Sequence, residues 1–344
     1  MELSLVDLAP IPEDGTATEA FENTLERAQH AERLGYSRFW VAEHHDFTDR
    51  LASTTPEVLI SHLAAQTSDI RVGSGTVLLN HYSPYKVAET FGVLDALAPD
   101  RIDLGLGRAT GNPVSDFALQ NERSQQRNPN DHAEKIDEVT KYLYGGFDDD
   151  NPFKQLSVAR SRDGIPDVWV LGSSPSSAAV AGELGLRYCF ASFIRPKPAV
   201  RAFEVYRDHF QPSPNGAGPD EPYGMIAVNV TCAETDEEAA RLRAVPEATR
   251  QRLQQGRVSE DPIYSVETAI DELGGVPDPT PDTIVPHEWP RQISGSPDTV
   301  RGLLDQMADQ TGVEEVIVQN QFANQEDELR SHELLADAVG LTPR

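Results

Sequence analysis

Polar residues that could do chemistry recur in this chain directly after short apolar runs. The pair His44-His45 follows one run, and Asn80-His81-Tyr82 follows another. Other apolar runs are followed by Arg108, Ser173, Ser174, Ser192, Arg195, Asn320 and Gln321. An imidazole titrates near neutral pH and can accept or donate a proton, and a guanidinium can hold an anion such as a phosphate. These residue types favour proton transfer beside a bound anionic ligand.

The histidine pair is the sharpest of these signals. Adjacent residues on a strand point to opposite faces, so at most one of His44 and His45 can enter a site. A barrel metal site would use His-x-His, which places both rings on one face, and the chain has no such spacing, so no metal is expected. One histidine can be structural, with its ring bonded to a backbone carbonyl, while the other contacts a cofactor or substrate. For His81 a structural role is favoured.

Alternating strand and helix patterns indicate the scaffold that positions these residues. Apolar strand-like runs occupy 3–9, 38–42, 70–79, 101–107, 167–171, 188–193, 225–232 and 315–319. Helical patterns occupy 18–34, 56–67, 84–97, 130–143, 176–184, 198–209, 297–310 and 326–339. Eight strands that alternate with helices predict an α/β protein with a single (β/α)8 TIM barrel. The polar residues then gather at the carboxyl ends of the strands, where such barrels place active sites. An open doubly wound sheet is the structural alternative.

Glycines interrupt two neighbouring predicted strands. Gly73 and Gly75 lie in one, and Gly105 and Gly107 lie in the next. Glycine inside a strand weakens it, so its presence needs a reason. Either the missing side chains leave space for a flat ligand, or they permit two backbones to approach closely. Both readings stay open from the residues alone.

Two serine-rich helix starts compete as a phosphate site. Ser173 and Ser174 precede one helix, and Ser294 and Ser296 precede the helix before the last strand. Unpaired N–H groups at a helix start attract anions, although the same residues are ordinary helix caps. The usual barrel phosphate site favours the later pair. Arg108 favours the earlier pair, because it follows the adjacent strand and would supply a cation.

The length of 344 residues exceeds the roughly 250 that are typical of such a barrel. The surplus is expected in insertions at about 111–129, 148–166 and 234–291, so residues 1–344 form one barrel without a second domain. Two of these stretches, 111–129 and 234–291, are expected to shape the substrate pocket. A mobile lid is expected in the latter.

The charge excludes several classes of partner. The chain has 56 acidic and 29 basic residues, a formal charge of -27. Such a chain is repelled by phosphate backbones and by anionic membranes, so no nucleic acid and no membrane partner is expected. No apolar stretch approaches the length of a membrane span, and the start lacks the features of a signal peptide, which together predict a cytoplasmic protein. Cys189 and Cys232 fit no metal spacing and are expected to be buried and inert.

The basic residues are almost all arginine. Only five are lysine, and the other 24 are arginine. An acidic, lysine-poor surface suits a cytoplasm with molar salt, where a Debye length of about 3 Å screens self-repulsion. The composition therefore predicts a halophilic source. The alternative is an acidic protein from a GC-rich genome, which favours arginine codons.

Several motifs together resemble the luciferase-like flavin-dependent monooxygenases, the TIM-barrel oxidoreductases related to bacterial luciferase. The motifs are "AERLGYSRFWVAEHH" at 31–45, "EVLISHLAAQTSDIRVGSGTVLLNHYSPYKVAE" at 57–89, "APDRIDLGLGRATG" at 98–111, "LGSSPSSAAVAGELGL" at 171–186 and "ISGSPDTV" at 293–300. Their order and spacing across roughly 300 residues make the resemblance specific. It implies a (β/α)8 barrel, usually a homodimer, that binds reduced FMN or the deazaflavin F420 at the barrel mouth.

The resemblance also assigns residues one at a time. His44 matches a catalytic histidine near the reactive part of the flavin, and Ser74-Gly75 matches the third-strand site of a non-prolyl cis peptide behind the flavin ring. Arg108 matches the arginine at the flavin phosphate, and Ser173, Ser174 and Ser177 match the phosphate-binding helix start. The resemblance thereby decides between the two serine pairs. The chain departs from luciferase where Gly107 replaces a reactive cysteine and Ser173 replaces an acidic residue, so light emission is not expected.

The function expected from this resemblance is that of a two-component monooxygenase. A separate reductase would supply reduced FMN, which with O2 would oxidise a small organic substrate such as an aldehyde. No G-x-G-x-x-G motif follows a strand, which is consistent with reduced flavin made elsewhere. One alternative is an F420-dependent hydride-transfer oxidoreductase. Another is a non-catalytic flavin-binding partner subunit.

Overall fold

Strands and helices alternate along the chain in the structure, which is a computed structural model. It describes residues 1–45, 50–108, 113–120, 131–159, 161, 164–257 and 262–344. The strands are β1 (Glu2–Asp7), β2 (Arg38–Val41), β3 (Arg71–Ser74), β4 (Val77–Leu78), β5 (Ile102–Gly107), β6 (Asp167–Gly172), β7 (Arg187–Ala191), β8 (Gly224–Cys232), β9 (Gln292–Gly295) and β10 (Glu315–Gln319).

The strands close into a parallel barrel. β1, β2, β3, β5, β6, β7 and β8 pair in this order, and β10 pairs with both β8 and β1. Because the ring of pairings is complete, the predicted (β/α)8 barrel is confirmed and an open doubly wound sheet is excluded. β4 continues the third barrel strand and pairs with β5, with Val77 opposite Leu106. β9 pairs only with the far end of β8, beyond the ring.

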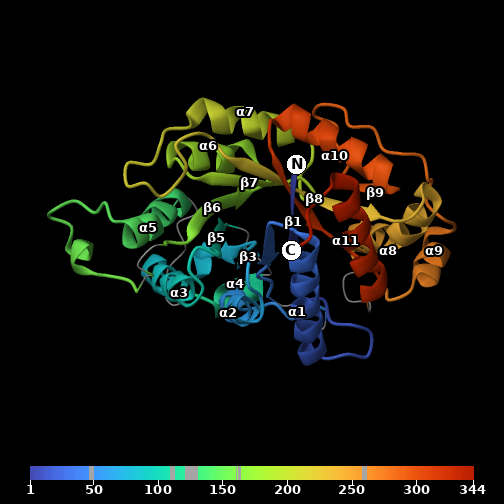
Figure 1. The fold of residues 1–344 in the computed structure, drawn as a ribbon, viewed down its shortest axis with the longest axis horizontal. Coiled ribbons are helices and arrows are strands. Elements are labelled where there is room, and N and C mark those ends of the chain that lie inside the picture. Colours follow the sequence, from blue (N-terminus) through green and yellow to red (C-terminus); the bar gives the residue numbers. More distant parts are fainter. Residues whose placement is uncertain (46–49, 109–112, 121–130, 160, 162–163, 258–261) are drawn as a thin grey trace.

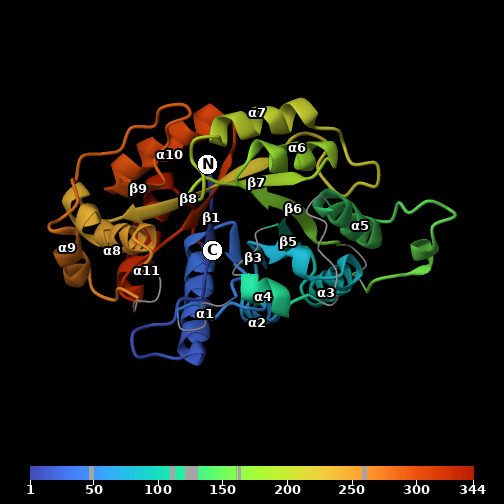
Figure 2. The same cartoon turned by 180° about the vertical axis from the view of Figure 1, so that it is seen from behind.

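Helices surround the barrel on its outside (Figures 1 and 2). They are α1 (Ala17–Leu34), α2 (Pro56–Gln66), α3 (Pro84–Leu97), α4 (Pro113–Ala118), α5 (His132–Tyr144), α6 (Pro175–Glu183), α7 (Ala199–His209), α8 (Asp236–Gln254), α9 (Val266–Leu273), α10 (Pro297–Thr311) and α11 (Gln325–Val339), with short 3-10 turns η1 (Leu79–His81) and η2 (Pro152–Gln155). In Figure 1, α5 lies at the left end of the molecule and α8 and α9 lie at the right end.

Local chemistry explains where the helices begin. At the start of α1, the Thr16 hydroxyl accepts a 3.3 Å hydrogen bond from the Glu19 N–H, and the Glu19 carboxylate accepts one of 2.8 Å from the Thr16 N–H. This reciprocal cap satisfies two donors that the helix itself leaves unpaired. α2, α3, α6 and α10 begin instead with proline, whose missing N–H costs nothing in the first turn.

The predicted insertions hold helices that the sequence pattern did not reveal. Within 234–291 lie α8 and α9, which pack on each other around Ala244, Val245, Ala248 and Ala269. α8 contains Pro246 and many charged residues, and these hide the helical period of its sequence. The insertion at 111–129 includes α4, while 111, 112 and 121–129 are outside the described residues. The insertion at 148–166 includes η2, and 160, 162 and 163 are likewise outside them.

Across the described ranges, no helix combines the length and the apolar composition that crossing a membrane requires. Cys189 and Cys232 are both buried free thiols, as predicted. Burial raises the pKa of each thiol.

Candidate active site at the carboxyl ends of the strands

An ionic layer fills the barrel where its strands begin. Arg38 donates to Asp103 (Nη1 to Oδ2, 2.8 Å) and to Glu315 (Nε to Oε1, 2.9 Å). Arg71 adds a 2.6 Å contact to Asp103. Burial raises the pKa of the Asp103 carboxyl, but Arg38 and Arg71 outweigh burial and hold that pKa below its ordinary value. This paired network belongs to the end of the barrel that usually serves stability.

Apolar side chains fill the barrel above the ionic layer. The rings of Trp40 and Trp169 meet edge to face with centroids 5.5 Å apart, and Met225 and Ile317 pack beside them. The next layer towards the strand ends is only partly buried at Val6 and Leu171. A side chain on Gly75 would lie 3.1 Å from Val6, so this glycine faces the same layer. We refer to Val6, Gly75, Leu171 and Ala227 as the apolar floor of the barrel mouth.

The glycines of β3 and β5 permit close backbone approach. A Cβ on Gly105 would lie 2.1 Å from the backbone oxygen of Ser74. The Ser74 hydroxyl fits into this contact: it donates to the Gly105 oxygen and accepts from the Gly105 N–H, both at 3.0 Å. A cis peptide bond joins Gly75 to Thr76, next to the expected site at Ser74-Gly75. The Ser74 side chain therefore joins two strands behind the mouth.

A buried carboxylate organises the loop after β2. The side chain of Glu43 accepts hydrogen bonds from His45 Nε2 (2.7 Å), the Leu78 N–H (2.8 Å) and the Tyr82 hydroxyl (2.6 Å). His45 also packs edge to face on His81, with ring centroids 5.7 Å apart. Burial raises the pKa of Glu43 despite these donors. Of the two adjacent histidines, His45 thus has a structural partner.

His44 differs from its neighbour in its surroundings. It is largely buried, and its backbone N–H donates to the oxygen of Ser53 at 2.9 Å. Burial, assisted by the nearby His45, lowers the pKa of the His44 ring. At neutral pH the ring is consequently uncharged and able to accept a proton.

Arg108 is an exposed cation at the end of β5. In the described part of the chain, no carboxylate forms an ion pair with its guanidinium, although acidic residues outnumber basic ones about two to one. Arg108 also helps to lower the pKa of the His132 ring to about 4, where burial is the larger cause. An unpaired guanidinium in so acidic a chain is available to an anionic ligand.

The start of α6 lies beside Arg108. Leu106 pairs with Val170, so two residues further along both strands Arg108 and Gly172 stand at the same level. A Cβ on Gly172 would lie 2.2 Å from the Ser177 hydroxyl, and only glycine lets the helix approach β6 so closely. The Ser174 hydroxyl caps the Ser177 N–H at 3.3 Å. No described group forms a hydrogen bond with the Ser173 hydroxyl, which is therefore available.

The other two serines of this turn are partly engaged. The Ser177 hydroxyl donates to the Ser174 oxygen at 2.7 Å and lies 3.1 Å from the Tyr188 hydroxyl. Ser174 shares a 2.8 Å contact with Ser176. These bonds hold the turn in shape, while Ser173 and the first N–H groups of α6 supply donors for an anion.

The competing helix start at Ser294 and Ser296 already has an acidic partner. The Ser296 N–H donates to the Asp236 carboxylate at 2.6 Å, and this bond lowers the pKa of Asp236. Ser294 accepts a 3.0 Å bond from Arg243. A carboxylate at a helix start occupies the place that a phosphate would take. The geometry thus favours the α6 site.

The mouth as a whole fits a phosphorylated planar ligand. Arg108, Ser173 and the start of α6 bring a cation and N–H and O–H donors to one side of the strand ends, and the apolar floor lies next to them. Ser192 and Asn320 at the same rim bond backbone oxygens, at 2.7 and 2.9 Å. A flat ring on an apolar floor buries its faces, and its phosphate meets a cation at the rim.

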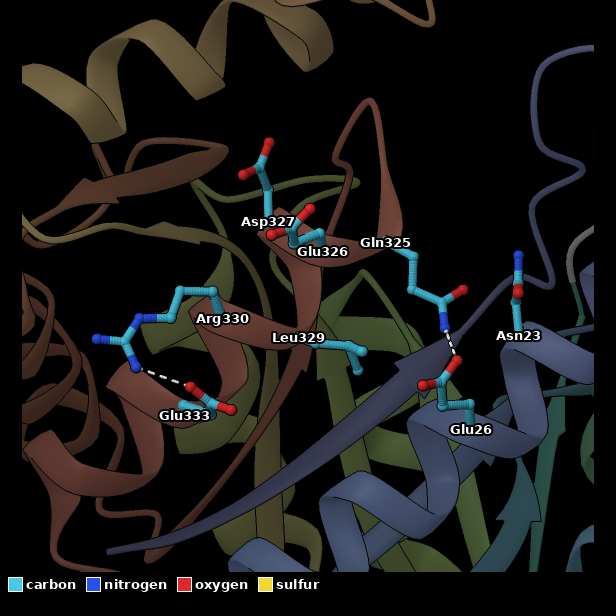
Figure 3. Close-up of a pocket in the computed structure, with 8 residues that line it drawn as sticks. All are labelled: Asn23, Glu26, Gln325, Glu326, Asp327, Leu329, Arg330 and Glu333. Carbon is cyan, nitrogen blue, oxygen red and sulfur yellow. Dashed lines mark hydrogen bonds and ion pairs between the residues drawn. The ribbon is translucent and has the colours of Figure 1, made fainter.

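A hollow lies on the outer wall of the barrel, between α1 and α11 (Figure 3). It has a volume of about 640 Å3, and mostly charged residues line it: Asn23, Glu26, Gln325, Glu326, Asp327, Leu329, Arg330 and Glu333. Gln325 donates to Glu26 at 2.5 Å, and Arg330 donates to Glu333 at 2.7 Å. The hollow holds none of the predicted site residues.

Comparison with known proteins identifies the family. Residues 1–315 match the family model described as luciferase-like monooxygenase. The chain belongs to this family. It is 41% identical to the uncharacterised protein YwcH of Bacillus subtilis over 98% of this chain and 99% of that one. It is 36% identical to the N-acetyl-S-alkylcysteine monooxygenase of the same organism, with 98% of each chain covered. As a luciferase-like monooxygenase, the protein is an oxidoreductase.

Solved structures share the barrel. Apo-MsnO8 is 41% identical, with a TM-score of 0.88 over 100% of this chain and 99% of its own. The oxygenating constituent of 3,6-diketocamphane monooxygenase from Pseudomonas putida, in complex with FMN, has a TM-score of 0.68 at 21% identity, with 98% of each chain covered. An F420-dependent secondary alcohol dehydrogenase has a TM-score of 0.64 at 13% identity, again over 98% of each. The last two show likeness of fold alone.

Sequence reasoning missed three residues of this luciferase-like mouth. In the sequence Glu43 was only a neighbour of the histidines. Its hydrogen-bond partners Leu78 and Tyr82, which flank η1, are 35 and 39 residues away in the chain. Asn229 within β8 and Gln319 at the end of β10 lie at the same level on the inner face of the barrel. The available signal was the two-residue period of a strand. Every second residue of 225–229 and of 315–319 faces the inside of the barrel, and the residues between them face the helices.

Proposed function

We propose that this luciferase-like monooxygenase binds reduced FMN and uses O2 to oxidise a small organic substrate, with the reduced flavin supplied by a separate reductase. The observation that carries the proposal is the exposed Arg108 at the level of the α6 start, where no carboxylate of the described residues forms an ion pair with it. It supplies a cation for a flavin phosphate, and the apolar floor supplies a surface for the ring. The family supplies the reaction class.

Bound reduced flavin would supply the electrons that activate O2, so that one oxygen atom reaches the substrate and the other leaves as water. The chain supplies binding and proton transfer. Arg108, Ser173 and the N–H groups of α6 bind the phosphate. Val6, Leu171 and Ala227 exclude water from the ring face. His44, neutral at working pH because burial lowers its pKa, accepts or returns a proton at its ring nitrogen.

Glu43 contributes by positioning. Its bonds to His45 and Tyr82 connect two segments, the loop after β2 and the turn after β4. His44 is in the first of these segments. Loss of this carboxylate would leave the loop without a common acceptor. The proton-transfer histidine would then lose its fixed place relative to the apolar floor.

We also propose that the chain forms a homodimer. Exposed apolar residues on two neighbouring helices support this. Val58 of α2 is 66% exposed, and Leu97 of α3 is 70% exposed. α2 and α3 lie against each other, so both side chains are on the outer surface of neighbouring helices. Large exposed apolar side chains gathered on adjacent helices are typical of an interface. We infer also that the excess of acid over lysine is an adaptation to high salt.

A titration tests the proposed function. Protein purified in molar salt is titrated with FMN, reduced FMN and F420, while absorbance and flavin fluorescence are followed. Tight binding of FMN, with oxygen consumption when reduced FMN is supplied, is expected.

The thioether N-acetyl-S-methylcysteine and a set of aldehydes serve as substrates, because the relative named for N-acetyl-S-alkylcysteine is 36% identical. Anaerobic turnover with F420, and none with FMN, would reverse the cofactor assignment. Tight flavin binding without turnover would indicate a non-catalytic subunit.

A further inference from the structure

Two side-chain amides lie next to each other inside the barrel at its open end. Met225, Ala227 and Ile317 pack in the interior cluster with Trp40, whereas the residues between them, such as Ile226 and Val228, pack in the outer core. Alternation along a strand therefore places Asn229 and Gln319 on the inner face. The register pairs Asn229 directly with Gln319, and Gln319 in turn with Val6 of the apolar floor.

These amides lack the hydrogen bonds that buried amides normally have. Gln319 is only 5% exposed, and Asn229 is partly buried, with its side-chain oxygen out of contact with solvent. Among the described residues nothing donates to the side-chain oxygen of either one. Two polar residues at the rim do have partners: Asn320 bonds to the Val230 oxygen and to His332, and Ser192 bonds to the Ala227 oxygen. Buried polar groups left unpaired destabilise a fold, so an explanation beyond packing is required.

Their position sets them across the mouth from the phosphate side. Around the closed barrel, β10 lies four strand positions from β5, by way of β1, β2 and β3. Four positions is the greatest separation that a ring of eight strands allows. The end of β10, where Gln319 lies, is thus opposite the end of β5, which Arg108 follows. A ligand or ligand pair that fills the mouth meets a cation at one side and two amides at the other.

The chemistry of the pair selects its ligand. A carboxamide offers one acceptor oxygen and an NH2 donor side by side, and rotation by 180° exchanges them. Two adjacent carboxamides therefore match a group with neighbouring N–H and C=O. The arginines of the ionic layer below are already paired with Asp103 and Glu315, so they do not neutralise the charge of a carboxylate bound at the amides. An alkyl chain would leave both oxygens unpaired.

We propose that Asn229 and Gln319 form a specificity subsite for an amide or imide group of the molecule bound in the mouth. The inference rests on the proposed function. The chemistry has two sources, namely the imide edge of a flavin ring and an amide of the organic substrate.

The two sources are separated with matched probe pairs. In the flavin arm, binding of FMN is compared with that of 3-methyl-FMN, in which a methyl group blocks the imide N–H. In the substrate arm, thermal shifts of the ligand-free protein with N-acetyl-S-methylcysteine are compared with those with 3-(methylthio)propanoate, which lacks the amide. The variants Asn229→Leu and Gln319→Met keep the side-chain volume but remove the amide. Gln321→Met is the control, because Gln321 is exposed and lies two residues further along the chain.

We expect wild-type protein to prefer the amide-bearing probe at least tenfold in one of the two arms. In Gln319→Met and Asn229→Leu this preference falls to about one, while Gln321→Met retains it. Melting temperatures of the two variants stay at or above that of wild type, because each substitution removes an unpaired buried group. Absence of any preference in wild type, or an unchanged preference in both variants, overturns the subsite. So does a lower melting temperature with unchanged preference, which indicates a structural role. Failure of wild type to bind FMN overturns the proposed function instead, and the substrate arm then still reports on the amide pair.

Discussion

The Tyr82 hydroxyl donates a 2.6 Å hydrogen bond to the buried Glu43 carboxylate, which links the end of β2 to the turn after β4. His45 and the Leu78 N–H donate to the same carboxylate. Three donors converge on one buried anion, and two of them come from the third barrel strand and its following turn. This carboxylate thereby ties the loop that carries His44 to the turn after β4.

Replacing the carboxylate by an amide should weaken this link. Glu43→Gln places an NH2 group where donors already point, so we expect a loss of about 2–3 kcal/mol in the free energy of unfolding. Tyr82→Phe removes one donor and should cost less. Urea unfolding measures both, and Glu13→Gln is the control because Glu13 is exposed. An effect of Glu43→Gln no larger than that of the control would contradict the role of Glu43.

The phosphate side of the mouth predicts a selective binding defect. Arg108→Ala removes the guanidinium beside the α6 start, so FMN should bind about 10- to 100-fold more weakly, as for loss of a charge-assisted hydrogen bond. Riboflavin lacks the phosphate and should bind equally well to the wild type and to Arg108→Ala. Fluorescence titration measures the two affinities. Arg33→Ala, at the far end of α1, is the control. Equal losses for FMN and riboflavin would place Arg108 away from the phosphate.

Much of the fold was predictable because hydrophobic period and helix-start signals agree along the chain. Most predicted strands and helices occur within about two residues of their expected limits, and the family follows from linear motifs. The exceptions have physical causes. α8 carries an internal proline and a strongly charged surface, so its period was hidden. β9 depends on pairing with the far end of β8, which no local pattern encodes.

The site was only partly predictable, for a related reason. Arg108 and Ser173 were found because they directly follow strands. The function of Glu43 depends on Leu78 and Tyr82, and that of Asn229 and Gln319 depends on strand register, so these residues required the tertiary structure. The glycines allowed two interpretations until the contact between Gly105 and Ser74 showed close approach.

His44 should affect oxygen transfer more than flavin binding. Because burial lowers its pKa, the ring is neutral at pH 7 and can act as a base. We expect His44→Ala to lower the product formed per flavin oxidised at least tenfold, with the affinity for FMN changed less than twofold. Product analysis against flavin reoxidation measures the ratio. His45→Asn is the companion variant and should reduce stability rather than yield. An unchanged yield in His44→Ala would remove the proposed role.

Buried His332 should make stability depend on pH. Burial, followed by the nearby His30 and Arg27, lowers its pKa to about 3, and its Nε2 lies 2.9 Å from Asn320 Oδ1. The unfolded chain, with an ordinary histidine pKa near 6.5, takes up this proton first as pH falls. The contribution of neutral His332 is thus complete above about pH 6.5 and declines by roughly 1 kcal/mol per pH unit below it.

His332→Gln keeps an N–H donor but cannot titrate, so its stability should fall less steeply between pH 6.5 and 4. Denaturant unfolding across that range tests this, with exposed His62→Gln as the control. Parallel curves for wild type and His332→Gln would show that His332 does not titrate differently on folding.

The charge predicts a requirement for salt. With a formal charge of -27, repulsion among carboxylates is strong in dilute buffer, while at 1 M salt the Debye length of about 3 Å suppresses it. Circular dichroism and flavin binding should therefore be lost on dialysis into dilute buffer and regained on return to molar KCl. Sucrose at equal osmolarity is the control, since it leaves the charges unscreened. A variant with exposed acids on α11, such as Glu326 and Asp337, changed to lysine should need less salt, because each change alters the net charge by two. Retained fold and binding in dilute buffer would show that the acidic composition is not an adaptation to salt.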